Sequence, residues 1–304
     1  MELLYWFESI RTPVLDVVMQ TVTRLGEETV FMLIAMLVFW CVDKRRGYYL
    51  LSVGFVGTLI NQWLKIVFRV PRPWVLDPNF QIVDSAKEAA TGYSFPSGHT
   101  QSAVGTLGGV ARFTGNVWLR VICIILALLT AVSRMYLGVH TPADVGVSLI
   151  VAVVLIFVLY PLFESTLWFP NRMYAIIGVM LGLSLAFVGF MEFYPFPADV
   201  DAANLASAVK NSYTMLGSVG GMLVVYTFDS KIMNFSTRAP WWGQAIKFVG
   251  GLALAVAVKS LLKAPLLALC GGHDAAHAIR YFALVVVAGG LWPMTFRIYE
   301  RFNR

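Results

Sequence analysis

Charged residues are scarce in this sequence of 304 residues: Asp, Glu, Lys and Arg together make up 13% of it, and hydrophobic residues make up 58%. A soluble domain is about 25% charged, so the composition excludes an ordinary soluble protein. Cysteine is also rare, with only Cys41, Cys123 and Cys270 present. Three scattered cysteines argue against a disulfide framework or a metal cluster. We therefore expect an integral membrane protein.

Strict alternation of apolar and polar residues is missing as well, which argues against a membrane β-barrel. The apolar segments are instead long enough, or nearly so, to cross about 30 Å of hydrocarbon as helices of about 20 residues. They comprise residues 27–42, 47–69, 98–114, 117–137, 141–163, 173–193, 204–226, 243–268 and 281–297. The sequence predicts an all-α fold, a polytopic transmembrane helical bundle of about nine spans.

Residues 1–25 differ from these segments because Glu8, Arg11 and Asp16 interrupt their apolar pattern, while one helical face stays hydrophobic. We expect an N-terminal interfacial amphipathic helix. The segment lacks the basic start, clean apolar core and small-residue cleavage site of a signal peptide.

Basic residues concentrate in alternate loops of the predicted bundle. The densest group, Lys44-Arg45-Arg46, follows the first span, and short cytoplasmic loops are enriched in Lys and Arg. Counting from there places the C-terminus in the cytoplasm, and the 70–97 loop and the 138–141 turn on the non-cytoplasmic side. The net charge of +6 is spread over loop ends, so we expect contacts with membrane lipids and no nucleic acid.

Three polar stretches fall on the predicted non-cytoplasmic side: "KIVFRVPRP" from residue 65, "PSGH" from residue 96 and "SRMYLGVHTPAD" from residue 133. Each alone also fits a snorkelling lysine, a helix cap or a satisfied polar residue. Their convergence on one end of the bundle favours a common site.

The chemistry of these residues suits a phosphate ester. Lys65, Arg72 and Arg134 supply three cations for phosphate oxygens. Ser97 and Gly98 precede a predicted helix start, where free backbone amides bind anions.

Two histidines remain for the reaction itself. Asp144 lies four residues after His140 and can orient its ring, which leaves the other nitrogen free to act as a nucleophile. Attack on phosphorus gives a phosphohistidine, and His99 then protonates the leaving group. The cations neutralise the charge, so we expect no metal and no cofactor.

The pattern K-x6-R-P, P-S-G-H and S-R-x5-H-x3-D resembles the three-part signature of the type 2 phosphatidic acid phosphatase superfamily. The resemblance covers roughly residues 25–165 and implies a membrane phosphatase. It implies that phosphate is bound by Lys65, Arg72, Ser97, Gly98 and Arg134. It assigns His140 as the nucleophile, Asp144 as its orienting group and His99 as the acid.

We divide the chain into an amphipathic helix (1–25), a phosphatase core (26–165) and a further four-span membrane region (166–304). The nine-span layout and the stretches "NQWLKIVFRVPRPW" and "VKNSYTMLG" resemble the glucose-6-phosphatase branch. We expect a lipid phosphate or diphosphate as substrate. A soluble sugar phosphate such as glucose 6-phosphate, or transfer to another acceptor, is the alternative. A transporter or sensor has little reason to keep both histidines.

Two further patterns have structural interpretations. The stretch "HDAAH" from His273 to His277 has zinc-ligand spacing, but it lies between predicted spans and we expect a lid or solvated loop. Glycines four residues apart let helices approach closely. We expect such packing at Gly105/Gly109, Gly178/Gly182 and Gly217/Gly221.

Overall fold

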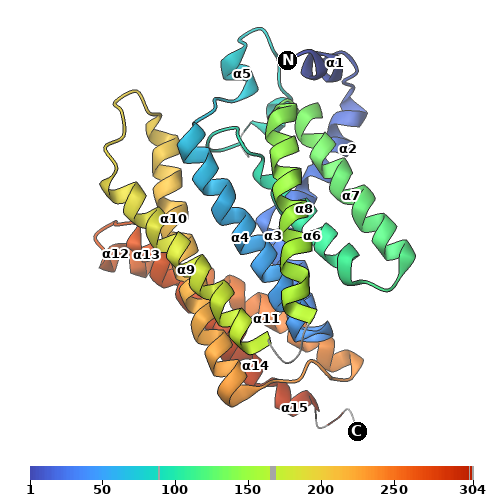
Figure 1. Cartoon of the computed structure of the whole chain (residues 1–304), viewed down its shortest axis with the longest axis vertical. Coiled ribbons are helices and arrows are strands. Elements are labelled where there is room, and N and C mark those ends of the chain that lie inside the picture. The colour runs from blue at the N-terminus through green and yellow to red at the C-terminus, as the bar shows by residue number, and fades with distance from the viewer. Residues whose placement is uncertain (88–89, 165–168, 301, 303–304) are drawn as a thin grey trace. The chain divides into compact units, whose positions relative to one another are not determined.

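The computed structural model describes residues 1–87, 90–164, 169–300 and 302, and these residues form helices and loops without a strand (Figure 1). The all-α prediction is confirmed. The longer helices are α1 (Glu2–Ser9), α2 (Pro13–Thr23), α3 (Glu28–Leu37), α4 (Lys44–Phe68), α6 (Gly98–Phe113), α7 (Val117–Tyr136), α8 (Pro142–Glu164), α9 (Phe169–Phe193), α10 (Ala202–Phe228), α11 (Trp241–Leu261) and α13 (Ala275–Val286). Shorter ones are α5 (Pro73–Leu76), α12 (Lys263–Leu269), α14 (Trp292–Met294) and α15 (Phe296–Glu300).

Among the described residues, six helical segments are long and apolar enough to cross a membrane. The number is seven if the bent pair Pro13–Gly26 and Glu28–Val42 is one span. A polytopic bundle is therefore confirmed, whereas a total of nine spans stays a prediction. α6 has 16 residues, fewer than the 18 that such a span requires, and α10 is also outside the set.

The N-terminal region is two helices, α1 and α2, where one was expected. α2 begins at Pro13, and its N-cap Thr12 accepts a hydrogen bond from the amide of Leu15. Arg11 fastens the junction between them, donating to the carbonyls of Gln81 and Tyr136. The N-terminus is thus tied to the loop and helix end that carry the polar motifs. Its interfacial position stays a prediction.

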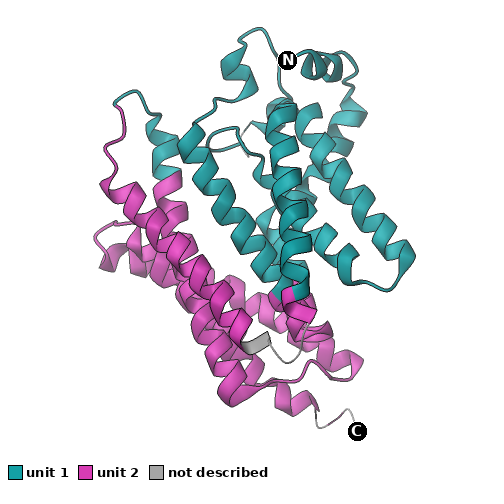
Figure 2. Cartoon of the chain, viewed as in Figure 1, with its two compact units in different colours: residues 1–34, 49–161, 198–207 teal, residues 35–48, 162–197, 208–304 magenta. Residues whose placement is uncertain are grey.

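The chain divides into two compact units (Figure 2). Unit 1 comprises residues 1–34, 49–161 and 198–207, and contains all three polar motifs. Unit 2 comprises residues 35–48, 162–197 and 208–304.

In unit 1, glycines bring α4 and α6 into close antiparallel contact. A methyl group at Gly105 would lie 3.3 Å from Val53, and one at Gly109 would lie 2.6 Å from Leu50. Because the residue number rises on α6 as it falls on α4, the two helices run in opposite directions. This pairing brings the start of α6 to the end of α4.

The glycine expectation holds for two of the three pairs. In unit 2, a methyl group at Gly217 would lie 2.0 Å from the carbonyl oxygen of Ala278, and one at Gly221 would lie 2.9 Å from Val285. Gly178 and Gly182 have no such neighbour within 4 Å. The packing interpretation is wrong for this last pair, because spacing alone does not say which helix face meets a partner.

Gly217→Ala should therefore destabilise unit 2, since the new methyl group forces α10 away from the α13 backbone. Overpacking of this kind costs about 1–3 kcal/mol. The matched control is Gly178→Ala, which meets open space and removes a flexible glycine from a helix. Thermal unfolding in detergent checks both, and equal melting temperatures for the two variants would contradict the close crossing.

Candidate active site

The first motif places two cations at the end of α4 and just beyond it. Lys65 donates its amine to the carbonyl of Tyr93. Arg72, only 7% exposed, donates to the carbonyls of Thr91 (2.7 Å), Gly92 (3.1 Å) and Val139 (2.9 Å). Arg72 thus connects the loop before α6 to the turn before α8.

The second motif forms the N-terminus of α6. Ser97 is the N-cap, and its hydroxyl oxygen accepts a hydrogen bond from the amide of Thr100 (3.3 Å). The Phe95–Pro96 peptide bond is cis. Gly98 is the first helical residue, and a methyl group there would lie 3.9 Å from the Asn61 side-chain oxygen. The helix therefore begins at the expected residue, and its first turn is not covered by a bulky side chain at Gly98.

Asp144, in the first turn of α8, joins the second motif to the third. Its Oδ2 accepts hydrogen bonds from the Ser94 hydroxyl (2.5 Å) and from the amide of Thr141 (2.7 Å). Its backbone carbonyl accepts from the amide of Ser97 (3.1 Å) and the hydroxyl of Ser148 (2.9 Å). The buried Asp144 therefore fixes both the turn before α6 and the turn before α8.

His140 lies in the turn between α7 and α8, with its two ring nitrogens in different surroundings. Nε2 is 3.0 Å from Nη1 of Arg72. Because a guanidinium can only donate, Nε2 accepts and carries the lone pair, which assigns the ring proton to Nδ1. Nδ1 lies 3.5 Å from Oδ2 of Asp144, longer than a hydrogen bond. Such contacts often tighten only when substrate binds.

The surroundings of His140 keep its ring neutral. Burial lowers the pKa of His140 well below 6.5, and the nearby Arg72, Arg134 and Lys65 lower it further. His99 also contributes to this lowering, so the two histidines and three cations are close enough to interact. The electrostatic contributions to His140 thus come from the residues that the sequence motifs single out.

Arg134 closes the site from the C-terminal turn of α7. It is only 2% exposed, and its Nη1 donates to the hydroxyl of Thr23 (2.8 Å) at the end of α2. Next to this contact, a methyl group at Gly26 would lie 2.5 Å from the backbone oxygen of His99. The N-terminal region therefore contacts both Arg134 and the first turn of α6, and holds them in position.

Three residues at the site escaped the sequence analysis: Ser94, Thr23 and Asn61. Asn61 precedes Lys65 by one helical turn and so shares its face of α4. It is 4% exposed, and its amide forms no hydrogen bond with a described group. The spacing to Lys65 was a usable signal for Asn61. Nothing in the sequence links Thr23 to Arg134 or Ser94 to Asp144.

The "HDAAH" stretch is outside unit 1 and differs from the expectation. His277 belongs to α13, is 6% exposed, and lies 3.5 Å from Asp274. His273 is exposed and precedes the helix. The solvated-loop interpretation is wrong for His277, because the helix begins two residues earlier and buries it.

Buried cations and two histidines at one end of a transmembrane helical bundle define a class of membrane proteins equipped to bind phosphate. Comparison with known proteins identifies the family. Residues 45–168 match the PAP2 superfamily, and residues 213–301 match the PAP2 superfamily phosphatase transmembrane extension. The chain belongs to the PAP2 superfamily, as the motifs led us to expect.

Three curated proteins are similar to parts of the chain. The undecaprenyl-diphosphatase BcrC of Bacillus subtilis is 31% identical over 39% of this chain, and an undecaprenyl-diphosphatase of Sulfolobus acidocaldarius is 29% identical over 43%. A probable sphingosine-1-phosphate phosphatase of Dictyostelium discoideum is 33% identical over 48%. The matches span 58%, 62% and 38% of these three proteins, respectively. No solved structure matches the chain.

Removing the hydroxyl in Ser94→Ala should destabilise unit 1, because the buried Asp144 carboxylate loses a short hydrogen bond. A hydrogen bond to a charged group contributes about 1.5–3 kcal/mol. Ser94→Thr is the control, since it keeps the hydroxyl and adds only a methyl group. Thermal unfolding of the two variants checks the role. If alanine and threonine lower the melting temperature equally, volume and not the hydrogen bond matters at this position.

Proposed function

We propose that this protein is a metal-independent membrane phosphatase that hydrolyses a phosphomonoester or diphosphate of a lipid through a phosphohistidine intermediate. The observation that carries the proposal is the neutral His140 ring, whose Nε2 lone pair lies 3.0 Å from the Arg72 guanidinium. A nucleophile is thereby kept unprotonated beside a group that binds phosphate.

Phosphate binding uses the cations and the α6 N-terminus. Oxygens of the substrate bind Arg72, Arg134 and Lys65, and the amides at Ser97 and Gly98 contribute further donors. A phosphate oxygen that binds Arg72 replaces the contact with Nε2 of His140. The lone pair is then directed at phosphorus instead of at the arginine.

The reaction proceeds in two displacements. Burial and the charges of Arg134, Arg72 and Lys65 lower the pKa of His99 to about 3, and the negative charge of a bound phosphate offsets these cations, so that the ring takes up a proton from solvent when substrate binds. Nε2 of His140 then attacks phosphorus while the bond to the leaving oxygen breaks, and His99 gives that oxygen its proton. Asp144 stabilises the positive charge that His140 acquires, through Nδ1–H. In the second step His99 takes a proton from water, whose oxygen attacks the phosphohistidine. Inorganic phosphate leaves, and His140 regains its neutral form.

The relatives support a lipid as the substrate. Their names designate phosphatases of undecaprenyl diphosphate and sphingosine 1-phosphate, both lipids that carry a terminal phosphate. The membrane bundle delivers such molecules to the site within the bilayer plane. The pattern of basic loops supports a site on the non-cytoplasmic side and a cytoplasmic C-terminus.

Purified protein in detergent should release phosphate from undecaprenyl diphosphate, phosphatidate or sphingosine 1-phosphate without added metal and in the presence of EDTA. Glucose 6-phosphate is the comparison substrate. We expect the lipid substrates to be preferred, because their chains can partition into the detergent that surrounds the bundle. Preference for glucose 6-phosphate would overturn the lipid proposal, and strict dependence on Mg²⁺ would overturn the mechanism.

His140→Ala should abolish turnover and phosphoenzyme formation, because no other group described at the site replaces its nucleophilic nitrogen. His99→Ala should lower kcat by roughly 10²- to 10⁴-fold, the usual contribution of a general acid. Rapid quenching at alkaline pH with ³²P-labelled substrate detects the acid-labile phosphohistidine. His273→Ala removes an exposed histidine and serves as the control. Labelling of the His140→Ala variant would place the nucleophile elsewhere.

A further inference from the structure

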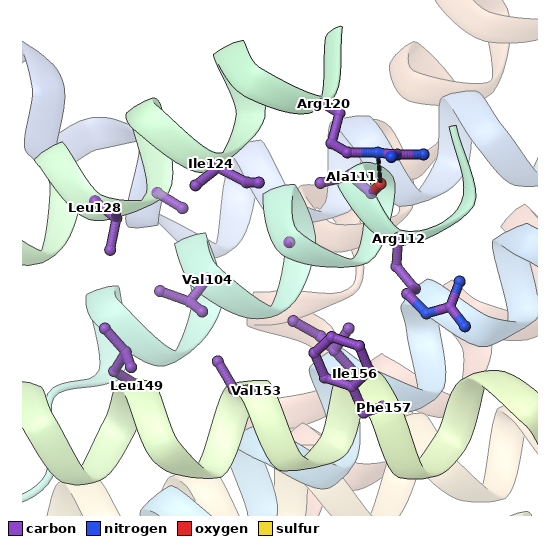
Figure 3. A pocket seen from close by; sticks show the side chains of 12 residues that line it. Val104, Ala111, Arg112, Arg120, Ile124, Leu128, Leu149, Val153, Ile156 and Phe157 are labelled. Atoms are coloured by element: carbon purple, nitrogen blue, oxygen red, sulfur yellow. Dashed lines mark hydrogen bonds between the residues drawn. The ribbon is translucent and has the colours of Figure 1, made fainter. Parts of the chain in front are cut away.

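An apolar groove lies in unit 1, towards the end of α6, α7 and α8 that is opposite the candidate catalytic motifs. It has a volume of about 490 Å³ and is formed by α6, α7 and α8 (Figure 3). Its walls are almost entirely apolar and include Val104, Ile124, Leu128, Val153 and Phe157. Three of these side chains, Ile124, Leu128 and Phe157, are between 45% and 59% exposed, so the cavity is an open groove on the bundle surface.

The groove is separate from the proposed catalytic site. It begins at Val104 on α6, at Leu149 on α8 and at Leu128 on α7. One helical turn nearer the catalytic motifs, Thr100, Ala131 and Val145 are all buried. This layer of buried side chains closes the groove towards His99 and Asp144.

Two arginines occupy the far end of the groove. Figure 3 shows Arg112 and Arg120 together at this end, beyond the apolar walls. Arg120 is held in place by hydrogen bonds from Nε to the carbonyl of Ala111 (3.2 Å) and from Nη2 to that of Thr114 (2.9 Å). Its guanidinium therefore stays beside the backbone that carries Arg112.

Among the residues that the structure describes, no carboxylate pairs with either arginine. The guanidinium of Arg112 lies 3.9 Å from the centre of the Tyr160 ring, and its Nε is buried without a hydrogen bond to a described group. Neither Arg112 nor Arg120 forms an ion pair with a described carboxylate. The apolar groove thus ends in two positive charges that lack an anionic partner within the part of unit 1 that the structure describes.

The depth of the two arginines suits a lipid headgroup. They flank the short connection from Phe113 to Val117, and Trp118 at the start of α7 is 78% exposed. Exposed tryptophans mark the boundary between hydrocarbon and headgroups. The arginines therefore lie at headgroup level, and the groove lies within the hydrocarbon.

We infer that this groove binds one anionic phospholipid, with an acyl chain along α6, α7 and α8 and its phosphate between Arg112 and Arg120. The charge complementarity of the arginine end selects an anionic headgroup. The volume falls within the range of about 300–1,000 Å³ that binding pockets occupy. The bound lipid is not the substrate, because the buried layer separates it from the histidines.

The probes are dioleoyl phosphatidylglycerol and dioleoyl phosphatidylcholine, which have the same chains and differ in headgroup charge. Neither carries a terminal phosphate for the proposed hydrolysis. Native mass spectrometry of the full-length protein should show preferential retention of phosphatidylglycerol. In Arg112→Gln/Arg120→Gln, this preference should fall by about 30-fold, since each arginine near the membrane surface contributes a factor of about five.

Two further variants distinguish lipid binding in the groove from a general effect of the protein's net charge. Val153→Trp keeps both arginines but fills the groove, so phosphatidylglycerol retention should fall. Lys231→Gln/Arg238→Gln removes two positive charges outside the groove and should leave the preference unchanged. The inference is overturned if wild type shows no preference, if the Arg112/Arg120 variant keeps it, or if the Lys231/Arg238 variant loses as much. Phosphate release should persist in all variants, which distinguishes failure here from failure of the proposed function.

Discussion

The arrangement of the site depends on the carboxylate and backbone of Asp144. The carboxylate accepts hydrogen bonds from Ser94, in the loop before α6, and from the amide of Thr141. The backbone carbonyl of Asp144 accepts a hydrogen bond from the amide of Ser97 at the start of α6. Two helix N-termini are thus fixed relative to each other by one residue. Without this junction, the turn proposed to bind phosphate and the proposed nucleophile His140 would belong to two independently moving loops, and preorganisation would be lost.

The site also contains positive charges that are buried from solvent. Arg72 and Arg134 are buried, and neither forms an ion pair with a described carboxylate. Buried charge is unfavourable unless it is paired or hydrogen-bonded. Backbone carbonyls satisfy Arg72, and Thr23 satisfies part of Arg134. These neutral acceptors hold the cations in position without cancelling them, so the phosphate of the proposed substrate would gain their full electrostatic attraction.

The sequence indicates which residues carry the chemistry of the candidate site, but not which residues hold them in position. Lys65, Arg72, His99, His140 and Asp144 are recognisable because local spacing and residue type carry their chemistry. Thr23 and Ser94 are not, because their partners are 111 and 50 positions away in the chain. The glycine pairs show the same limit: identical spacing produced close contacts at Gly217 and none at Gly178. Span number depends on helix length and tilt, which composition does not determine.

The antiparallel arrangement of α6 and α7, followed by α8, gives each end of this helix group a different chemistry. At one end, α6 and α8 begin and α7 ends, so two helix N-termini and Arg134 gather where we propose that phosphate binds. At the other end, Arg112 closes α6 and Arg120 lies in the first turn of α7. A cation near a helix C-terminus is favoured by the dipole, as at Arg112, whereas Arg120 sits near an N-terminus and gains nothing from it. Its guanidinium instead donates to the carbonyls of Ala111 and Thr114 at the end of α6, where it satisfies carbonyls that the helix leaves free. The same hydrogen bonds hold its charge beside Arg112, where the headgroup of the inferred lipid would lie.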